Sequence, residues 1–177
     1  MKANAGVQVS DPSRGSFDPP RIAPNLFGPV EANAFLREMT APWLQDLRLT
    51  VEACSRSGAA LRLPRSARLL RVGEALSGPA LMACAHTAMA IAVMGDSGGL
   101  RNVAMVSLTV DFMNSIPAGD VAIGATVRRR GRSLTFTECT FFEPRNRDVA
   151  AHATATWGLI PATAVRRWRN CTEIRDL

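Results

Sequence analysis

The feature that most constrains the fold is an apolar run from Gly78 to Met94 (GPALMACAHTAMAIAVM). Alanine and methionine favour helix, Pro79 suits the first turn, Ser77-Gly78 suits the cap, and Gly95 is expected to end the helix. Because the run is apolar all round, we expect a helix buried on every side. It is shorter than the roughly 20 apolar residues of a membrane span, and His86 interrupts it, so we expect no membrane span.

Segments with strand character lie on both sides of this run. Alternation of apolar and polar residues, bounded by turn residues, predicts extended structure at 47–54, 60–63, 67–72, 103–114, 121–130, 133–143 and 149–159. A single helix that is apolar all round needs a sheet curved about it. The sequence therefore predicts an α+β fold, in which five to six antiparallel strands wrap one long buried helix. Such a sheet leaves an uncovered face, so a homo-oligomer is expected.

The length of 177 residues corresponds to one domain, and 47% apolar residues suffice for a core. Residues 1–30 hold five of the eleven prolines and read as an extended or disordered arm. A short helix is expected at 31–39, and the domain is expected to span 31–160. Residues 161–177 form a basic tail.

The chain is basic, with 21 cationic and 15 anionic side chains. Lys2 is its one lysine, so nearly all the positive charge is arginine. Arginine suits an anionic ligand because its guanidinium group binds phosphate in a bidentate manner. Codon usage in a GC-rich genome would produce the same bias.

The four cysteines are widely spaced and form no CxxC pair, so no zinc site is expected. They are Cys54, Cys84, Cys139 and Cys171. No apolar stretch follows the charged N-terminus as it would in a signal peptide. We therefore expect a cytoplasmic protein with free, mostly buried thiols.

Three motifs occur in a consistent order around the predicted helix. They are Gly73–Met82 (GEALSGPALM), Val106–Asp120 (VSLTVDFMNSIPAGD), and Val127–Leu134 (VRRRGRSL) followed by Val149–Thr156 (VAAHATAT). With these motifs the chain resembles the hotdog-fold acyl-CoA thioesterases, in particular the PaaI-like branch of phenylacetate degradation. The resemblance extends from about residue 47 to residue 160. It is more specific for the fold than for the reaction.

The resemblance implies a catalytic site at the beginning of the helix. In the family, a backbone N–H at this point binds the thioester oxygen, and Gly78 holds the matching position. Ser77 stands where the family usually has histidine. His86, nine positions after Ser77, stands where the family has a catalytic aspartate or glutamate. Ser107 matches a position that holds the attacking water across the dimer interface.

His86 therefore has three interpretations. Neutral imidazole is a suitable general base near pH 7, although it supplies no negative charge. Alternatively, His86 marks a protein that binds its ligand without hydrolysis, or it is a hydrogen-bonded core histidine. Asp111 and Glu74 are the nearby carboxylates that would compensate, or else are solvated charges.

Four arginines within five residues mark a predicted hairpin tip at 128–132. Coenzyme A carries three phosphates, which guanidinium groups bind well. A nucleic-acid patch is disfavoured because no aromatic residues are interleaved with the arginines. The resemblance places the CoA contacts on two turns, at Asn114, Pro117, Ala118 and Gly119 and at Arg129, Arg130, Gly131, Arg132 and Ser133.

These observations predict hydrolysis of an acyl-CoA thioester by a dimer or a dimer of dimers. No metal is expected, and no cofactor other than the CoA of the substrate. The alternative is a non-catalytic protein that binds acyl-CoA or an aromatic ligand. A dehydratase-type hotdog enzyme is a third interpretation, but the Ser-Gly-Pro sequence before the helix does not resemble those enzymes.

Overall fold

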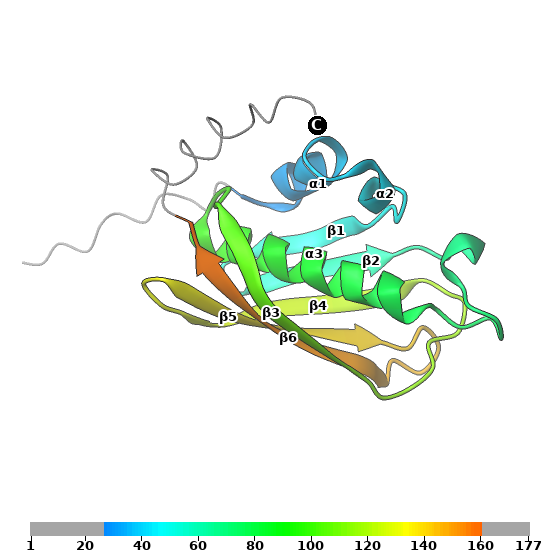
Figure 1. The fold of residues 1–177 in the computed structure, drawn as a ribbon. Helices are drawn as coiled ribbons and strands as arrows, with labels where there is room; N and C mark the ends of the chain where they lie inside the picture. The colour runs from blue at the N-terminus through cyan, green and yellow to red at the C-terminus, as the bar shows by residue number, and fades with distance from the viewer. Residues whose placement is uncertain (1–26, 161–177) are drawn as a thin grey trace, which may run out of the picture.

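A computed structural model describes residues 27–160, which form one antiparallel sheet and the helices around it. Six strands lie in the order β1-β2-β4-β5-β6-β3, and the curved sheet wraps around one long helix, α3 (Figure 1). This is the predicted hotdog arrangement. The strands are β1 (Thr50–Ser55), β2 (Gly58–Leu63), β3 (Val103–Phe112), β4 (Val121–Arg130), β5 (Leu134–Phe142) and β6 (Val149–Leu159).

Helix α3 (Gly78–Ser97) runs three residues beyond the predicted end. Gly98, at φ 71°, ends it in the left-handed conformation. Gly95 lies inside the helix instead, where a Cβ atom would come within 2.7 Å of both Cys54 Sγ and Ser55 O. The glycine is thus required by the close approach of α3 to β1, and the prediction that it ends the helix is wrong.

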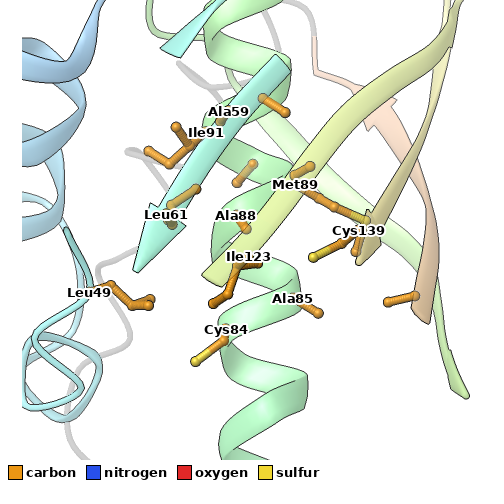
Figure 2. Packing of buried hydrophobic residues seen from close by; sticks show 14 of the residues in the cluster. Leu49, Ala59, Leu61, Cys84, Ala85, Ala88, Met89, Ile91, Ile123 and Cys139 are labelled. Atoms are coloured by element: carbon orange, nitrogen blue, oxygen red, sulfur yellow. The ribbon is translucent and has the colours of Figure 1, made fainter. Parts of the chain in front are cut away.

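The core lies between α3 and the concave face of the sheet. Small helix residues such as Ala85 and Ala88 allow the helix to approach larger strand residues such as Leu61 and Ile123 (Figure 2). Cys54, Cys84 and Cys139 are buried, as expected for free thiols in a core. Helix α3 is long and apolar enough to cross a membrane, but most of it is buried inside the protein, as in a core helix.

The two edges of the sheet differ. Helices α1 (Pro29–Glu38) and α2 (Pro42–Gln45) lie beside β1 (Figure 1). From α1, the Asn33 side chain donates to Val51 O and accepts from Val51 N–H, both at 2.9 Å. The amide thus takes the place of a further strand next to Val51. At the opposite edge, β3 pairs with β6 and with no other strand of the described residues.

The segment 67–72 is not extended as predicted. It begins with a short 3₁₀ helix, η1 (Ala67–Leu69), and then turns back on itself. Leu70 forms a bridge with Leu76, and Gly73 and Glu74 make the turn with positive φ. Within residues 27–160 no strand lies alongside this segment, and its backbone groups bond locally, as in the 2.8 Å bond from Arg71 N–H to Ala75 O.

Candidate active site

The N-terminus of α3 presents a backbone donor that is not used within the fold. Ser77 occupies the cap position without a side-chain hydrogen bond, and its own N–H donates to Leu69 O at 2.9 Å. Among the described residues, the Gly78 N–H has no hydrogen-bond partner. The ring of Phe112 lies 3.5 Å from where a Gly78 Cβ would be. The free amide and the positive end of the helix dipole favour a partly negative oxygen here.

One face of the first turns of α3 is open, so the expectation of burial on every side is wrong for this half of the helix. Pro79, Met82 and His86 are exposed and Ala83 is half-buried. Their spacing of three and four residues makes them one continuous stripe, which we call the α3 stripe. From Ala88 to Gly95, every residue is buried.

His86 lies in the α3 stripe about two turns after Gly78. Its ring centroid is 5.3 Å from that of the buried Trp157, with the planes tilted by 57°. No hydrogen bond holds the imidazole among residues 27–160, so it is not a hydrogen-bonded core histidine. Partial desolvation lowers the pKa of His86 from its usual 6.5. The ring is therefore neutral at pH 7 and has a free nitrogen to accept a proton.

Neither of the two carboxylates considered above forms an ion pair with His86. Asp111 is in register with His152 and is exposed on β3. Glu74 is exposed in the turn before α3. In the described part of the chain, the only carboxylate within 4 Å of a histidine nitrogen is Glu138, which lies 3.9 Å from His152.

Ser107 lies on the opposite face of the sheet from the imidazole. A β-bulge between Met105 and Ser107 brings Ser107 opposite Thr156, and both line a shallow hollow on the face turned away from α3. Trp157, which contacts His86, points toward the helix. One chain alone therefore does not bring Ser107 to His86.

The two turns expected to contact CoA lie at opposite ends of α3. Pro117 bridges Ala75 just before the helix, and Leu76 N–H donates to Ile116 O at 2.9 Å. Arg130, in contrast, forms a 3.0 Å ion pair with Asp96 in the last helical turn. At 1.5 Å rise per residue, Gly78 and Asp96 are about 27 Å apart along the helix.

Each turn has its own internal support. In the first turn, Asn114 Nδ2 donates to Val149 O at 3.3 Å, Ala118 is half-buried, and Gly119 lies so close to Pro144 that a Cβ would meet it at 2.9 Å. In the second, Gly131 N–H donates to Leu134 O at 2.7 Å.

The arginines of the second turn differ in how they are held. Arg128 forms an ion pair with Glu138 at 3.2 Å, and Arg130 is held by Asp96. Arg129 and Arg132 form no ion pair among the described residues, and Ser133 uses its carbonyl to accept from Leu159 N–H. Arg129 and Arg132 thus leave two guanidinium groups free for a phosphate.

Three side chains around the site were missed by the sequence analysis. Phe112 lies beside Gly78, Trp157 lies against His86, and Met82 completes the open stripe. Of the three, only Phe112 could have been found from the sequence, because it is a large apolar residue at the end of a predicted strand, directly before the Asn114 turn. Nothing in the sequence pattern links Trp157 to His86.

The fold and this site define a class: the chain has the hotdog thioesterase fold, with an open helix N-terminus beside an exposed imidazole. Residues 73–150 match the family described as the thioesterase superfamily. These residues include the N-terminus of α3, His86 and both turns.

Known proteins with similar sequence or structure agree with this class. A Thermoplasma volcanium protein named as a putative esterase is 27% identical over 104 residues, which cover 59% of this chain and 77% of that protein. The zebrafish thioesterase superfamily member 2 structure has a TM-score of 0.68 at 19% identity, covering 75% of this chain and 98% of that one. The Escherichia coli PaaI structure has a TM-score of 0.63 at 18% identity, covering 73% and 91%. The two structural similarities agree with the hotdog fold described above.

Proposed function

We propose that this protein hydrolyses an acyl-CoA thioester to a free acid and CoA, as a homodimer or dimer of dimers in the cytoplasm. The observation that carries the proposal is the exposed imidazole of His86 in the open first half of α3, about two turns after the unused Gly78 amide. The three cysteines within residues 27–160 are buried and unpaired, which agrees with a reducing compartment.

The Gly78 N–H would stabilise the negative charge that develops on the thioester oxygen during the reaction. When water attacks a thioester carbonyl, the oxygen becomes negatively charged, and a fixed N–H at a helix N-terminus stabilises that charge. Gly78 also leaves room for the thioester, because it has no side chain of its own, and the ring of Phe112 would form the neighbouring wall. Pro79 has no N–H and cannot contribute a second donor.

His86 would act as the general base. Its neutral nitrogen takes a proton from water as the water oxygen bonds to the carbonyl carbon. The C–S bond then breaks, and the leaving thiolate receives the proton from the imidazolium. Ser77 is placed beside Gly78 to orient the water. Ser107 lies on the face of the sheet turned away from α3, so we assign it no part in this step.

A second copy has a clear place to bind. Strand β3 offers a free edge, and large apolar side chains in it and directly after it are exposed: Val106 at 65%, Phe112 at 52% and Met113 at 52%. Antiparallel pairing of two β3 edges would cover these side chains around a twofold axis. It would also place the C-terminal end of one α3 beside the N-terminal end of the other.

This pairing would reconcile the positions of the two CoA-binding turns. In one chain they lie about 27 Å apart along α3. In an antiparallel pair, the arginine turn of one chain and the Asn114 turn of the other lie at the same end of the assembly. The free guanidinium groups of Arg129 and Arg132 would then bind the CoA phosphates, and CoA enters only as part of the substrate.

The proposal is tested by measuring thiol release from a panel of acyl-CoAs. We expect turnover that His86→Ala reduces at least 100-fold, the usual contribution of a general base. His152→Ala is the matched control, because the only other histidine lies on the face of the sheet turned away from α3. Full activity in His86→Ala would refute the assigned base.

Among residues 27–160 no carboxylate pairs with His86, and this favours one alternative, a protein that binds acyl-CoA without hydrolysing it. Calorimetry with a CoA ester would then show binding, whereas no thiol would be released. In that case His86→Asp, which restores the carboxylate usual in the family, should gain turnover. Turnover by the unmodified protein would exclude this alternative.

A further inference from the structure

A second hollow lies beside the α3 stripe, between α2, η1 and the first turns of α3. Its volume is about 300 Å³. The residues on its α2 and η1 side precede residue 73, where the match to the thioesterase superfamily begins, so this wall is formed by sequence outside the family match. The lining residues are Trp43, Asp46, Leu47, Arg68, Leu69, Pro79, Ala80 and Ala83.

The hollow adjoins the proposed reaction centre. Pro79 and Ala83 belong both to its wall and to the α3 stripe that carries His86. Leu69 on the opposite wall accepts the hydrogen bond from Ser77 N–H at 2.9 Å. Gly78 directly precedes Pro79 and Ala80 of this wall, so a thioester carbonyl at the Gly78 amide would lie next to the hollow.

The chemistry of the hollow suits a neutral apolar group. Trp43 is 62% exposed, although indole is a side chain that is normally covered. Leucine, proline and alanine supply the remaining apolar wall. Asp46 and Arg68 are exposed and opposite in charge, so the hollow carries no net charge. Its volume is about twice the 150 Å³ of an apolar cavity that binds benzene.

We propose that this hollow holds the acyl group of the substrate, that Trp43 is its specificity-determining wall, and that the preferred substrates carry a ring-sized apolar acyl group. This inference rests on the proposed thioesterase function and specifies its substrate. Each methylene buried in the hollow would improve binding about fourfold. A ring-bearing acyl group gains from the hollow, whereas an acetyl group is too small to fill it.

The test compares kcat/KM for benzoyl-CoA and acetyl-CoA. Trp43→Ala should lower the benzoyl-to-acetyl ratio at least tenfold, and Trp43→Phe should keep it within about threefold because an aromatic face remains. Phe136→Ala is the matched control, since Phe136 is also an exposed aromatic residue but lies on the face of the sheet turned away from α3. This control should leave the ratio unchanged.

A second variant approaches the hollow from the helix. Ala83→Leu adds side-chain volume to the α3 wall and should reduce benzoyl-CoA turnover while acetyl-CoA turnover persists. Thermal unfolding checks that each variant is folded. An unchanged ratio in both Trp43→Ala and Ala83→Leu would overturn the inference. Equal losses on both substrates together with dissociation of the oligomer would also overturn it, because Trp43 would then be covered by a second chain.

Failure of this inference can be separated from failure of the proposed function. Calorimetry with the non-hydrolysable benzyl thioether of CoA measures binding without chemistry. If the protein hydrolyses no thioester, the proposed function fails, yet a Trp43-dependent affinity for this thioether over CoA alone would still support the hollow. If hydrolysis depends on His86 but the thioether binds no better than CoA, the hollow is not the acyl site and the proposed function stands.

Discussion

Gly95 gives a direct measure of how closely α3 approaches the sheet. Replacing a glycine inside a helix with alanine normally stabilises a protein by about 1 kcal/mol. At Gly95 the added Cβ would meet Cys54 Sγ and the backbone oxygen of Ser55, each at 2.7 Å. These contacts are too short to persist, and one involves a backbone atom of β1, so part of the strand must move.

Overpacking of this kind costs about 1–3 kcal/mol. Because two contacts are violated at once, we expect the steric cost to exceed the gain in helix propensity. Gly95→Ala should therefore lower the free energy of unfolding by about 1–2 kcal/mol and Tm by about 3–6 °C for a domain of this size. Urea unfolding followed by circular dichroism measures the change.

Gly99→Ala provides the control, because nothing lies within 4 Å of where its Cβ would be. Its effect should stay within about 0.5 kcal/mol. Adding Cys54→Ala to Gly95→Ala removes one of the two short contacts, so the double mutant should be more stable than the sum of the single effects predicts. Stabilisation by Gly95→Ala alone would show that α3 and β1 are not in close contact.

Three further predictions concern titration, thiols and a buried hydrogen bond. Because desolvation lowers the pKa of His86, kcat/KM should rise with pH and level off with a midpoint below 6.5, and His86→Ala should abolish that inflection. Burial raises the pKa of Cys84 to about 12, so peptide mapping after iodoacetamide treatment should find Cys84 unlabelled in the native protein and labelled in urea. Trp157 Nε1 donates to Thr137 Oγ1 at 2.9 Å, so Trp157→Phe should lower the free energy of unfolding by about 1–3 kcal/mol in chemical denaturation, and an unchanged midpoint would contradict this.

The sequence predicted the fold well where local pattern and packing agree. The ranges of β4 and β6 match the predicted ones, because their alternation of apolar and polar residues reflects one face on the core. The end of α3 was missed at Gly95, because a glycine that permits close packing and a glycine that ends a helix look alike in sequence. Only the position of β1 distinguishes the two.

The site was less predictable than the fold. Met82 and His86 lie among alanines, so the stripe that leaves them exposed has no polar pattern to reveal it. Ser107 was identified from its motif, but the bulge beside it determines which face of the sheet it occupies, and bulges leave little trace in sequence. The contact between His86 and Trp157 joins residues 71 positions apart and depends on the tertiary structure alone.

The unequal edges of the sheet determine how far copies of this chain can associate. Asn33 blocks the β1 edge at Val51, whereas β3 remains open. A sheet with two open edges could add chains without limit and grow into a fibre, but a sheet with one open edge is used up when two such edges join. Strand addition is therefore self-terminating at a pair, and a substitution such as Asn33→Ala would remove the stop that separates a finite assembly from an unlimited one.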